Sequence, residues 1–209
     1  MWRKAVLFMA LFDFITDEKL RSQLVFMVEC DKVKNIFRRT LITDGSRREN
    51  DAEHSWHLAL CAMIFEEYAA DEINMLKVLK MVTVHDLIEI YAGDTFAYDT
   101  EGLASKAQRE HEAADKLFGL LDAEQCEEFR SLWLEFESRE TPDALYAAAM
   151  DTIQPLIHNY MTDGATWKGG VTSDKVYERN APVKAAAPGL WQVVEGIIEG
   201  SVKKGILKR

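Results

Sequence analysis

The chain has 209 residues, of which 48% are hydrophobic and 29% charged, so it can form one domain with a full hydrophobic core and is too apolar to be disordered throughout. It contains only 11 glycines and 4 prolines, which favours helices over a turn-rich β fold. The net charge of −10 argues against long nucleic acid as a partner, because an acidic surface repels the phosphate backbone, but local arginines could still hold a small anionic substrate.

The N-terminal segment MWRKAVLFMALFDFI has a basic start and an apolar run from Ala5 to Phe12, which is the outline of a secretory signal. The run is short, is interrupted by Asp13 and lacks a small-x-small cleavage site. The 3 cysteines are widely spaced and lie outside any CxxC pattern, which argues against a disulfide framework. We therefore expect no signal peptide, no membrane anchor and a cytoplasmic location.

Apolar residues recur at three- and four-residue steps in the first half of the chain, which is the period of an α-helix. This spacing predicts helices over residues 17–37, 52–70 and 71–91. We expect the first helix to bend near Asp31. The polar stretch at residues 41–51 predicts a loop that supplies Asn50 or Asp51 as the cap of the next helix. Within that helix, Trp56 is expected to face the core.

A long polar loop at residues 92–102 separates the two halves, and loops of this length are usually functional. The second half predicts helices over residues 105–121, 122–136, 143–161, 173–186, where Pro182 should interrupt the helix, and 190–204. Pro155 should kink the third of these, and the glycine-rich stretch at 163–170 should form a surface loop with an exposed Trp167. The predicted fold is therefore all-α, a single domain over residues 1–209 with about seven to eight helices.

The dipeptide His85-Asp86 is the first candidate for chemistry. It interrupts the otherwise apolar stretch VTVHDLIEIYAGD, and buried charges are costly unless they are paired or bind a metal. Neighbours on a straight helix diverge by about 100°, so both side chains can reach one ion only beside an irregularity of the helix. Glu89 lies one turn further on the same side. The alternative is a satisfied core histidine with a capping aspartate.

Two further polar residues interrupt apolar helices elsewhere in the chain. His54 lies near the start of the helix predicted at 52–70, and Asp151 interrupts the run LYAAAMDTIQPLI. Together with His85 and Asp86, they supply two imidazoles and two carboxylates. Such a mixed nitrogen and oxygen set suits one divalent ion of Mn, Fe, Co, Ni, Mg or Zn, rather than a thiolate-bound structural zinc.

The motifs KNIFRRT, SRRENDAEHSW, VHDLIEIYAGD and AAMD, taken in this order, carry a resemblance to a known family. The pattern resembles the H…HD…D signature of the HD-domain metal-dependent phosphohydrolases, and in particular their 5′-deoxynucleotidase branch. The likeness covers residues 17–162. It implies an all-helical fold, a divalent cation held by His54, His85, Asp86 and Asp151, and hydrolysis of nucleoside 5′-monophosphates.

The resemblance also implies roles for residues around these ligands. Glu89 and Asp94 match the catalytic glutamate and aspartate that follow the HD pair in the family. Arg38 matches the phosphate-contacting arginine best, with Arg39 as the alternative register. The family also leads us to expect a homodimer, an expectation that the aromatic-rich helix near Trp133 supports weakly.

The remaining candidates have alternatives that the sequence leaves open. Arg47 could bind substrate phosphate, since guanidinium groups suit phosphate oxygens, or could pair with a nearby glutamate. His57 is expected to pack near the site and to support a ligand, His111 to be solvated, and His158 to be structural.

The choice of substrate is less closely defined. The bulky residue that follows the phosphate-contacting arginine in the deoxynucleotidases is replaced by Arg39 and Thr40, so we expect only weak discrimination between ribose and deoxyribose. Residues 163–209 match nothing in the family pattern. The rival hypotheses are an enzyme acting on a nucleoside triphosphate, guanosine tetraphosphate or another phosphorylated small molecule, and a non-catalytic helical regulatory module.

Overall fold

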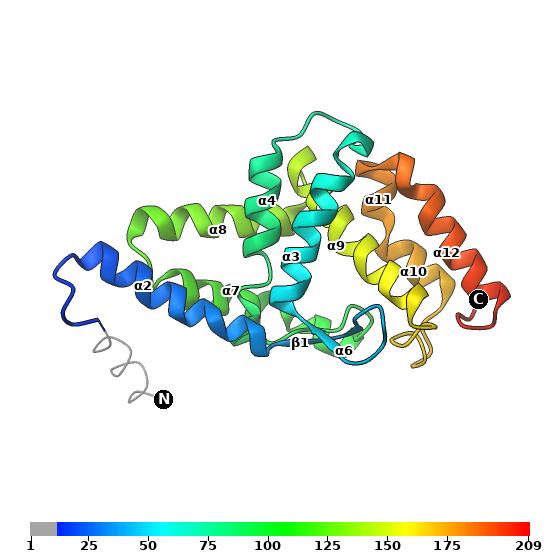
Figure 1. Ribbon diagram of the computed structural model, residues 1–209, viewed down its shortest axis with the longest axis horizontal. Helices are drawn as coiled ribbons and strands as arrows, with labels where there is room; N and C mark the ends of the chain where they lie inside the picture. The colour runs from blue at the N-terminus through cyan, green and yellow to red at the C-terminus, as the bar shows by residue number, and fades with distance from the viewer. Residues whose placement is uncertain (1–11) are drawn as a thin grey trace.

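The computed structural model describes residues 12–209, which form an elongated helical molecule (Figure 1). The apolar run at Ala5–Phe12 lies almost wholly outside the described residues. The first half contains α2 (Glu18–Cys30), a 3₁₀ turn (Asp31–Asn35), β1 (Phe37–Leu41), β2 (Arg48–Asn50), α3 (Asp51–Ile64), a second 3₁₀ turn (Glu66–Tyr68), α4 (Met75–Val84) and α5 (Glu89–Ala92).

The second half is also helical. It contains α6 (Thr100–Ala104), α7 (Lys106–Phe118), α8 (Ala123–Ser138), α9 (Pro142–Met161), α10 (Ser173–Arg179), α11 (Ala181–Ala186), a 3₁₀ turn (Pro188–Leu190) and α12 (Trp191–Lys203). The all-α prediction is confirmed, although the described residues contain short helices and 3₁₀ turns in addition to the predicted helices. Within residues 12–209, no helix combines the length and apolar character needed to cross a membrane.

Helix α9 is the central element, in contact with α3, α4, α8, α11, α12 and β1. Thr141 caps it, Pro142 occupies its first turn, and the small residues Ala144 and Ala147 are fully buried, which lets neighbouring helices approach closely. The helix continues through Pro155. In Figure 1, α2, α7 and α8 extend to one side of α9, and α10, α11 and α12 cover the other.

The buried apolar side chains form two clusters that meet at the end of α4. Val82 belongs to the cluster built around α3, α9 and α12. Val84 and Ile88 belong to the cluster that α2, α7 and α8 complete. The residues between them, including His85 and Asp86, therefore lie at the boundary between the two cores.

Three predicted boundaries differ from the structure. The helix predicted at 17–37 ends near Asp31, and the loop predicted at 41–51 is largely an antiparallel β1–β2 hairpin, in which Phe37 pairs with Asn50. The helix predicted at 71–91 is broken by a turn at residues 85–88. The interruption expected at Pro182 within residues 173–186 is present, since α10 ends at Arg179 and Pro182 lies in the first turn of α11.

Two tryptophan predictions were wrong. Trp56 is 68% exposed, because the buried face of α3 carries His54, Leu58 and Cys61, and a residue two positions after His54 points to the opposite side. Trp167 is only 3% exposed. A side chain at Gly164 would lie 2.9 Å from its ring, so the glycine allows the loop to fold Trp167 into the core.

Candidate metal and phosphate site

His54 lies in the first turns of α3, where local sequence fixes the start of the helix. The Asn50 side chain accepts a hydrogen bond from the Glu53 amide at 2.9 Å, and the Glu53 carboxylate accepts one from the Asn50 amide at 3.3 Å. This reciprocal capping box begins the helix at Asp51. One turn later His54 is fully buried, with its ring directed toward α9.

The turn at residues 85–88 brings the adjacent His85 and Asp86 to the same point. Because α4 ends at Val84, the two side chains do not diverge as they would on a straight helix. His85 Nε2 lies 3.1 Å from Asp86 Oδ2. The helix therefore has, at this dipeptide, the irregularity that binding of one ion by both side chains requires.

Asp151 completes the group from α9. Its Oδ1 atom lies 3.0 Å from His54 Nε2 and 3.9 Å from His85 Nε2. Asp86 Oδ2 lies 3.9 Å from the same His54 nitrogen. The four residues predicted as metal ligands, which come from three separate parts of the chain, are therefore brought together at one place.

The donor atoms present suit a divalent cation. One donor from each of His54, His85 and Asp151 falls within 4.8 Å of the others. His85 Nδ1 lies 3.0 Å from the Val82 carbonyl oxygen, which can only accept, so this nitrogen carries the proton. The buried Nε2 atom, which has no hydrogen-bond partner within residues 12–209, keeps a lone pair directed at the group. A ligand set of two imidazole nitrogens and carboxylate oxygens suits divalent transition-metal ions.

The amide of Gln154 supports His54 from behind. Its Oε1 atom lies 3.2 Å from His54 Nδ1, which fixes a proton on Nδ1 and makes Nε2, directed at Asp151, the atom that a metal would bind. The amide nitrogen donates to Glu49 Oε1 at 2.7 Å and lies 3.1 Å from both His57 Nδ1 and His158 Nε2. The expected supporting role of His57 and structural role of His158 agree with these contacts.

Arg38 lies beside the carboxylates and is 9% exposed. It extends from β1, and its Nη1 atom donates to Asp86 Oδ2 at 2.6 Å and lies 3.5 Å from Asp51 Oδ1. Burial alone would lower the pKa of Arg38, but the charges of Asp86 and Asp151 outweigh it and raise the pKa. The side chain therefore keeps its positive charge next to the candidate metal ligands.

An acidic group lies on the other side of Asp86. Asp51, Asp86 and Glu89 each place a carboxylate oxygen within 4.8 Å of the others. Burial, followed by the charge of Asp86, raises the pKa of Asp51 to about 7 and that of Glu89 well above its ordinary value. Burial also raises the pKa of Asp94. The Asp51 carboxyl can therefore hold a proton near neutral pH, and the raised pKa values of Glu89 and Asp94 favour their protonated forms, which suits acid–base catalysis.

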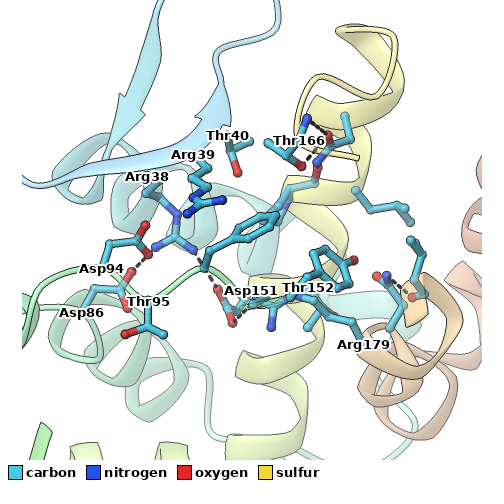
Figure 2. A pocket seen from close by; sticks show the side chains of 18 of the residues that line it. Arg38, Arg39, Thr40, Asp86, Asp94, Thr95, Asp151, Thr152, Thr166 and Arg179 are labelled. Carbon is cyan, nitrogen blue, oxygen red and sulfur yellow. Dashed lines mark hydrogen bonds and ion pairs between the residues drawn. The ribbon is translucent and has the colours of Figure 1, made fainter. Parts of the chain in front are cut away.

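The site opens into a cavity of about 550 Å³. Figure 2 shows Arg38 and Arg39 side by side on one wall, with Asp86, Asp94 and Asp151 below them. Arg179 enters from α10, and its Nη2 atom lies 3.8 Å from Asp151 Oδ2. The cavity therefore has a carboxylate and imidazole floor and cationic walls, an arrangement suited to a phosphorylated molecule.

Two predicted residues lie elsewhere. Arg47 forms two hydrogen bonds with Glu53 at 2.8 Å and is not among the residues that line the cavity; its binding to substrate phosphate stays a prediction. His111 is exposed, as expected, with its ring 5.1 Å from that of Trp133.

Sequence reasoning missed three residues of the site. Asp51 was considered only as a helix cap, although it precedes His54 by three positions and therefore shares its face of the helix. Gln154 has the same relation to Asp151 on α9. For Arg179 the sequence carries no signal, because its approach depends on how α10 packs beside α9.

Comparison with known proteins agrees with this geometry. The family model described as HD domain matches residues 30–191. The chain is 27% identical to the 5′-deoxynucleotidase HDDC2 of Danio rerio over 142 residues, which cover 66% of this chain and 70% of that protein. It is 27% identical to the 5′-deoxynucleotidase HDDC2 of Dictyostelium discoideum over 147 residues, covering 68% and 77%.

A solved structure is also similar. The crystal structure of a predicted metal-dependent phosphohydrolase from Magnetospirillum magnetotacticum superposes with a TM-score of 0.88 at 45% sequence identity. The match covers 92% of this chain and 97% of the other.

Proposed function

This chain belongs to the HD domain family, and from that premise we propose that it is a metal-dependent phosphomonoesterase that hydrolyses nucleoside and deoxynucleoside 5′-monophosphates to nucleoside and inorganic phosphate. The observation that carries the proposal is the convergence of His54, His85, Asp86 and Asp151 beside Arg38 on the floor of one cavity. The names of the related 5′-deoxynucleotidases support the substrate class.

Each residue then has a defined task. His54, His85, Asp86 and Asp151 would hold a divalent cation, which would lower the pKa of a water molecule and offset charge on the phosphoryl oxygens. Arg38 binds the phosphate and is already oriented by Asp86. Glu89, with its raised pKa, positions the attacking water and exchanges a proton with it. Asp94 lies on the cavity wall, where it binds a water molecule or helps to protonate the departing 5′ oxygen.

We also propose a cytoplasmic location, which the free thiols of Cys30, Cys61 and Cys126 support. Discrimination between the sugars should be weak, because Arg39 and Thr40 are the residues that follow Arg38 on the cavity wall. We expect deoxyribonucleotides to be favoured by about tenfold or less.

The test is phosphate release from a panel of compounds by protein loaded with each of Mn, Co, Fe, Ni, Mg and Zn. The panel contains ribo- and deoxyribonucleoside 5′-monophosphates, the 3′-monophosphates, triphosphates and guanosine tetraphosphate. We expect release from 5′-monophosphates of both sugar series. Exclusive activity on a triphosphate or on guanosine tetraphosphate would refute the proposed substrate class.

A matched pair of variants tests the site itself. Asp86→Ala should abolish hydrolysis and reduce the metal content, because it removes a charged ligand. Asp71→Ala, which changes an exposed aspartate between α3 and α4, should keep both. Full activity and metal content in the Asp86 variant would show that the site is misassigned.

A further inference from the structure

A second cavity of about 520 Å³ adjoins the first. The two cavities share the lining residues Arg39, Phe96, Tyr98, Thr166 and Lys175. Because the same side chains line both, the two cavities lie next to each other. A molecule with its phosphate on Arg38 would therefore have its other end near the second cavity.

The second cavity is positively charged, although the chain as a whole is acidic. Its charged lining residues are Arg39, Arg48, Lys175 and Asp99. The Asp99 carboxylate accepts a hydrogen bond from the Gly102 amide at 3.1 Å. Within residues 12–209, none of the three cations has a carboxylate within ion-pair distance. In a protein of net charge −10, three unpaired cations around one cavity favour an anionic ligand there.

The first cavity differs in its charge balance. Its cations are matched by carboxylates, among them Asp86, which is bonded to Arg38, and Asp151, which Arg179 approaches. An excess of positive charge is therefore found in the second cavity, where Arg48 adds to Arg39 and Lys175, which line both cavities.

Arg39 connects the two cavities. Its guanidinium carbon lies 4.5 Å from the centroid of the Phe96 ring, so the ring holds the side chain over the groove. Figure 2 shows the guanidinium groups of Arg38 and Arg39 next to each other, with Thr166 on the opposite wall. A sugar between these walls would present one end to Arg38 and the other to Arg39.

We infer that the second cavity binds a second phosphate group of the substrate, so that nucleoside 3′,5′-bisphosphates are better substrates than the 5′-monophosphates. The inference rests on the proposed function, because it places the 5′-phosphate on Arg38. In the reaction, water supplies the oxygen that bonds to phosphorus and the proton that the departing 5′ oxygen takes up. The products are inorganic phosphate and the nucleoside 3′-monophosphate.

The test compares deoxyadenosine 3′,5′-bisphosphate with deoxyadenosine 5′-monophosphate as substrates of the metal-loaded protein. We expect kcat/KM to be at least about tenfold higher for the bisphosphate, since charge-assisted hydrogen bonds to phosphate are strong. Arg48→Gln and Lys175→Gln should each lower this ratio severalfold. Lys203→Gln, which removes an exposed charge at the end of α12, should leave it unchanged.

Two outcomes would overturn the inference while leaving the proposed function intact. One is equal or lower kcat/KM for the bisphosphate in the wild-type protein. The other is a fall of kcat/KM by the same factor for both compounds in the Arg48 and Lys175 variants, which would mean that these cations only attract anions from a distance.

A binding measurement separates this inference from the proposed function. Calorimetric titration with each compound should give a lower Kd for the bisphosphate, and the Arg48 and Lys175 variants should remove that difference. If neither compound is hydrolysed, the proposed function fails, and the titration still decides the second phosphate site. Equal Kd values for the two compounds would reject that site.

Discussion

At the scale of single residues, the carboxamide of Gln154 is the group that sets the state of His54. It can accept a hydrogen bond from His54 only through its oxygen, while its nitrogen serves the buried Glu49. The bonds therefore orient the amide, and the amide orients the imidazole. A polar network of this kind is effective only when every member has a partner.

We predict that Gln154→Met weakens metal binding by about 10–100-fold, the usual cost of losing a group that orients a ligand. The substitution also leaves Glu49 without its hydrogen-bond donor, so the free energy of unfolding should fall by roughly 1–3 kcal/mol. Metal Kd is measured by calorimetry at a temperature where circular dichroism shows folded protein. Gln192→Met on the exposed face of α12 is the control, and an unchanged Kd for the Gln154 variant would contradict the prediction.

The protonation of His54 predicts how metal binding depends on pH. Burial and Arg38 would lower its pKa, but hydrogen bonds with Asp151 and Glu49 outweigh them and raise it from 6.5 to about 9. In the metal-free protein this proton contributes stability that is fully present below pH 6.5 and is lost as pH rises through 9. Metal must displace the proton.

Metal affinity should therefore increase as pH rises from 6.5 to about 9. Near neutral pH, calorimetry in buffers of different ionisation enthalpy should detect about one proton released from this group per ion bound. A Kd that is constant over this range would show that His54 is not the group whose proton the metal replaces.

Substitutions of Glu89 and Asp86 should have different effects on turnover and metal content. Glu89→Gln is expected to reduce turnover by roughly 10²–10⁴-fold, the usual contribution of an acid–base residue, while metal content stays near that of the wild-type protein. Asp86→Asn should lose the metal. Equal metal loss in both variants, measured by elemental analysis, would refute this division of roles.

At the scale of elements, the ends of two helices place the site. The turn after α4 brings His85 and Asp86 together, and the capping box before α3 sets which residues of that helix face α9. Both features act through hydrogen bonds of a few backbone groups. Small local changes at these ends should therefore have effects at the site.

Asn50→Ala is predicted to lower the free energy of unfolding by about 1 kcal/mol, because the side chain caps the Glu53 amide. Asn50→Asp keeps the acceptor and should recover most of the stability. Thermal unfolding of the two variants is the measurement. Equal losses in both would mean that the cap does not stabilise α3.

At the scale of the whole molecule, the site lies where the two cores meet, and a large part of its wall comes from the C-terminal helices. The predicted homodimer remains a prediction. The Trp133 side chain itself offers no contact surface, because it is 2% exposed and packs inside the second core. Trp56 and Met63 lie seven positions apart on α3 and are 68% and 51% exposed, so they form the more suitable contact surface.

If the protein is a homodimer through this face of α3, Trp56→Glu should produce monomers at micromolar concentration without loss of fold, since the side chain is exposed. Light scattering coupled to size-exclusion chromatography gives the mass. Leu76→Glu, which changes another residue that is 67% exposed, is the control. A wild-type protein that is monomeric throughout would overturn the dimer prediction.

The sequence by itself determined the helical class, the approximate boundaries of α7, α8, α9 and α12, and the identity of the charged residues that interrupt apolar helices. It could do so because helical periodicity and the cost of burying charge act locally. His54, His85, Asp86 and Asp151 were found in this way, and the structure brings them together. The HD domain family was visible in the same motifs.

Only the tertiary structure decided which other residues join them. Asp51, Gln154 and Arg179 reach the site because α3, α9 and α10 pack together, and Trp167 is buried because its loop folds back over α9. The second cavity likewise combines Arg48 from β2 with Lys175 from α10. These positions depend on contacts between elements that are separate in the sequence, which a periodic pattern does not encode.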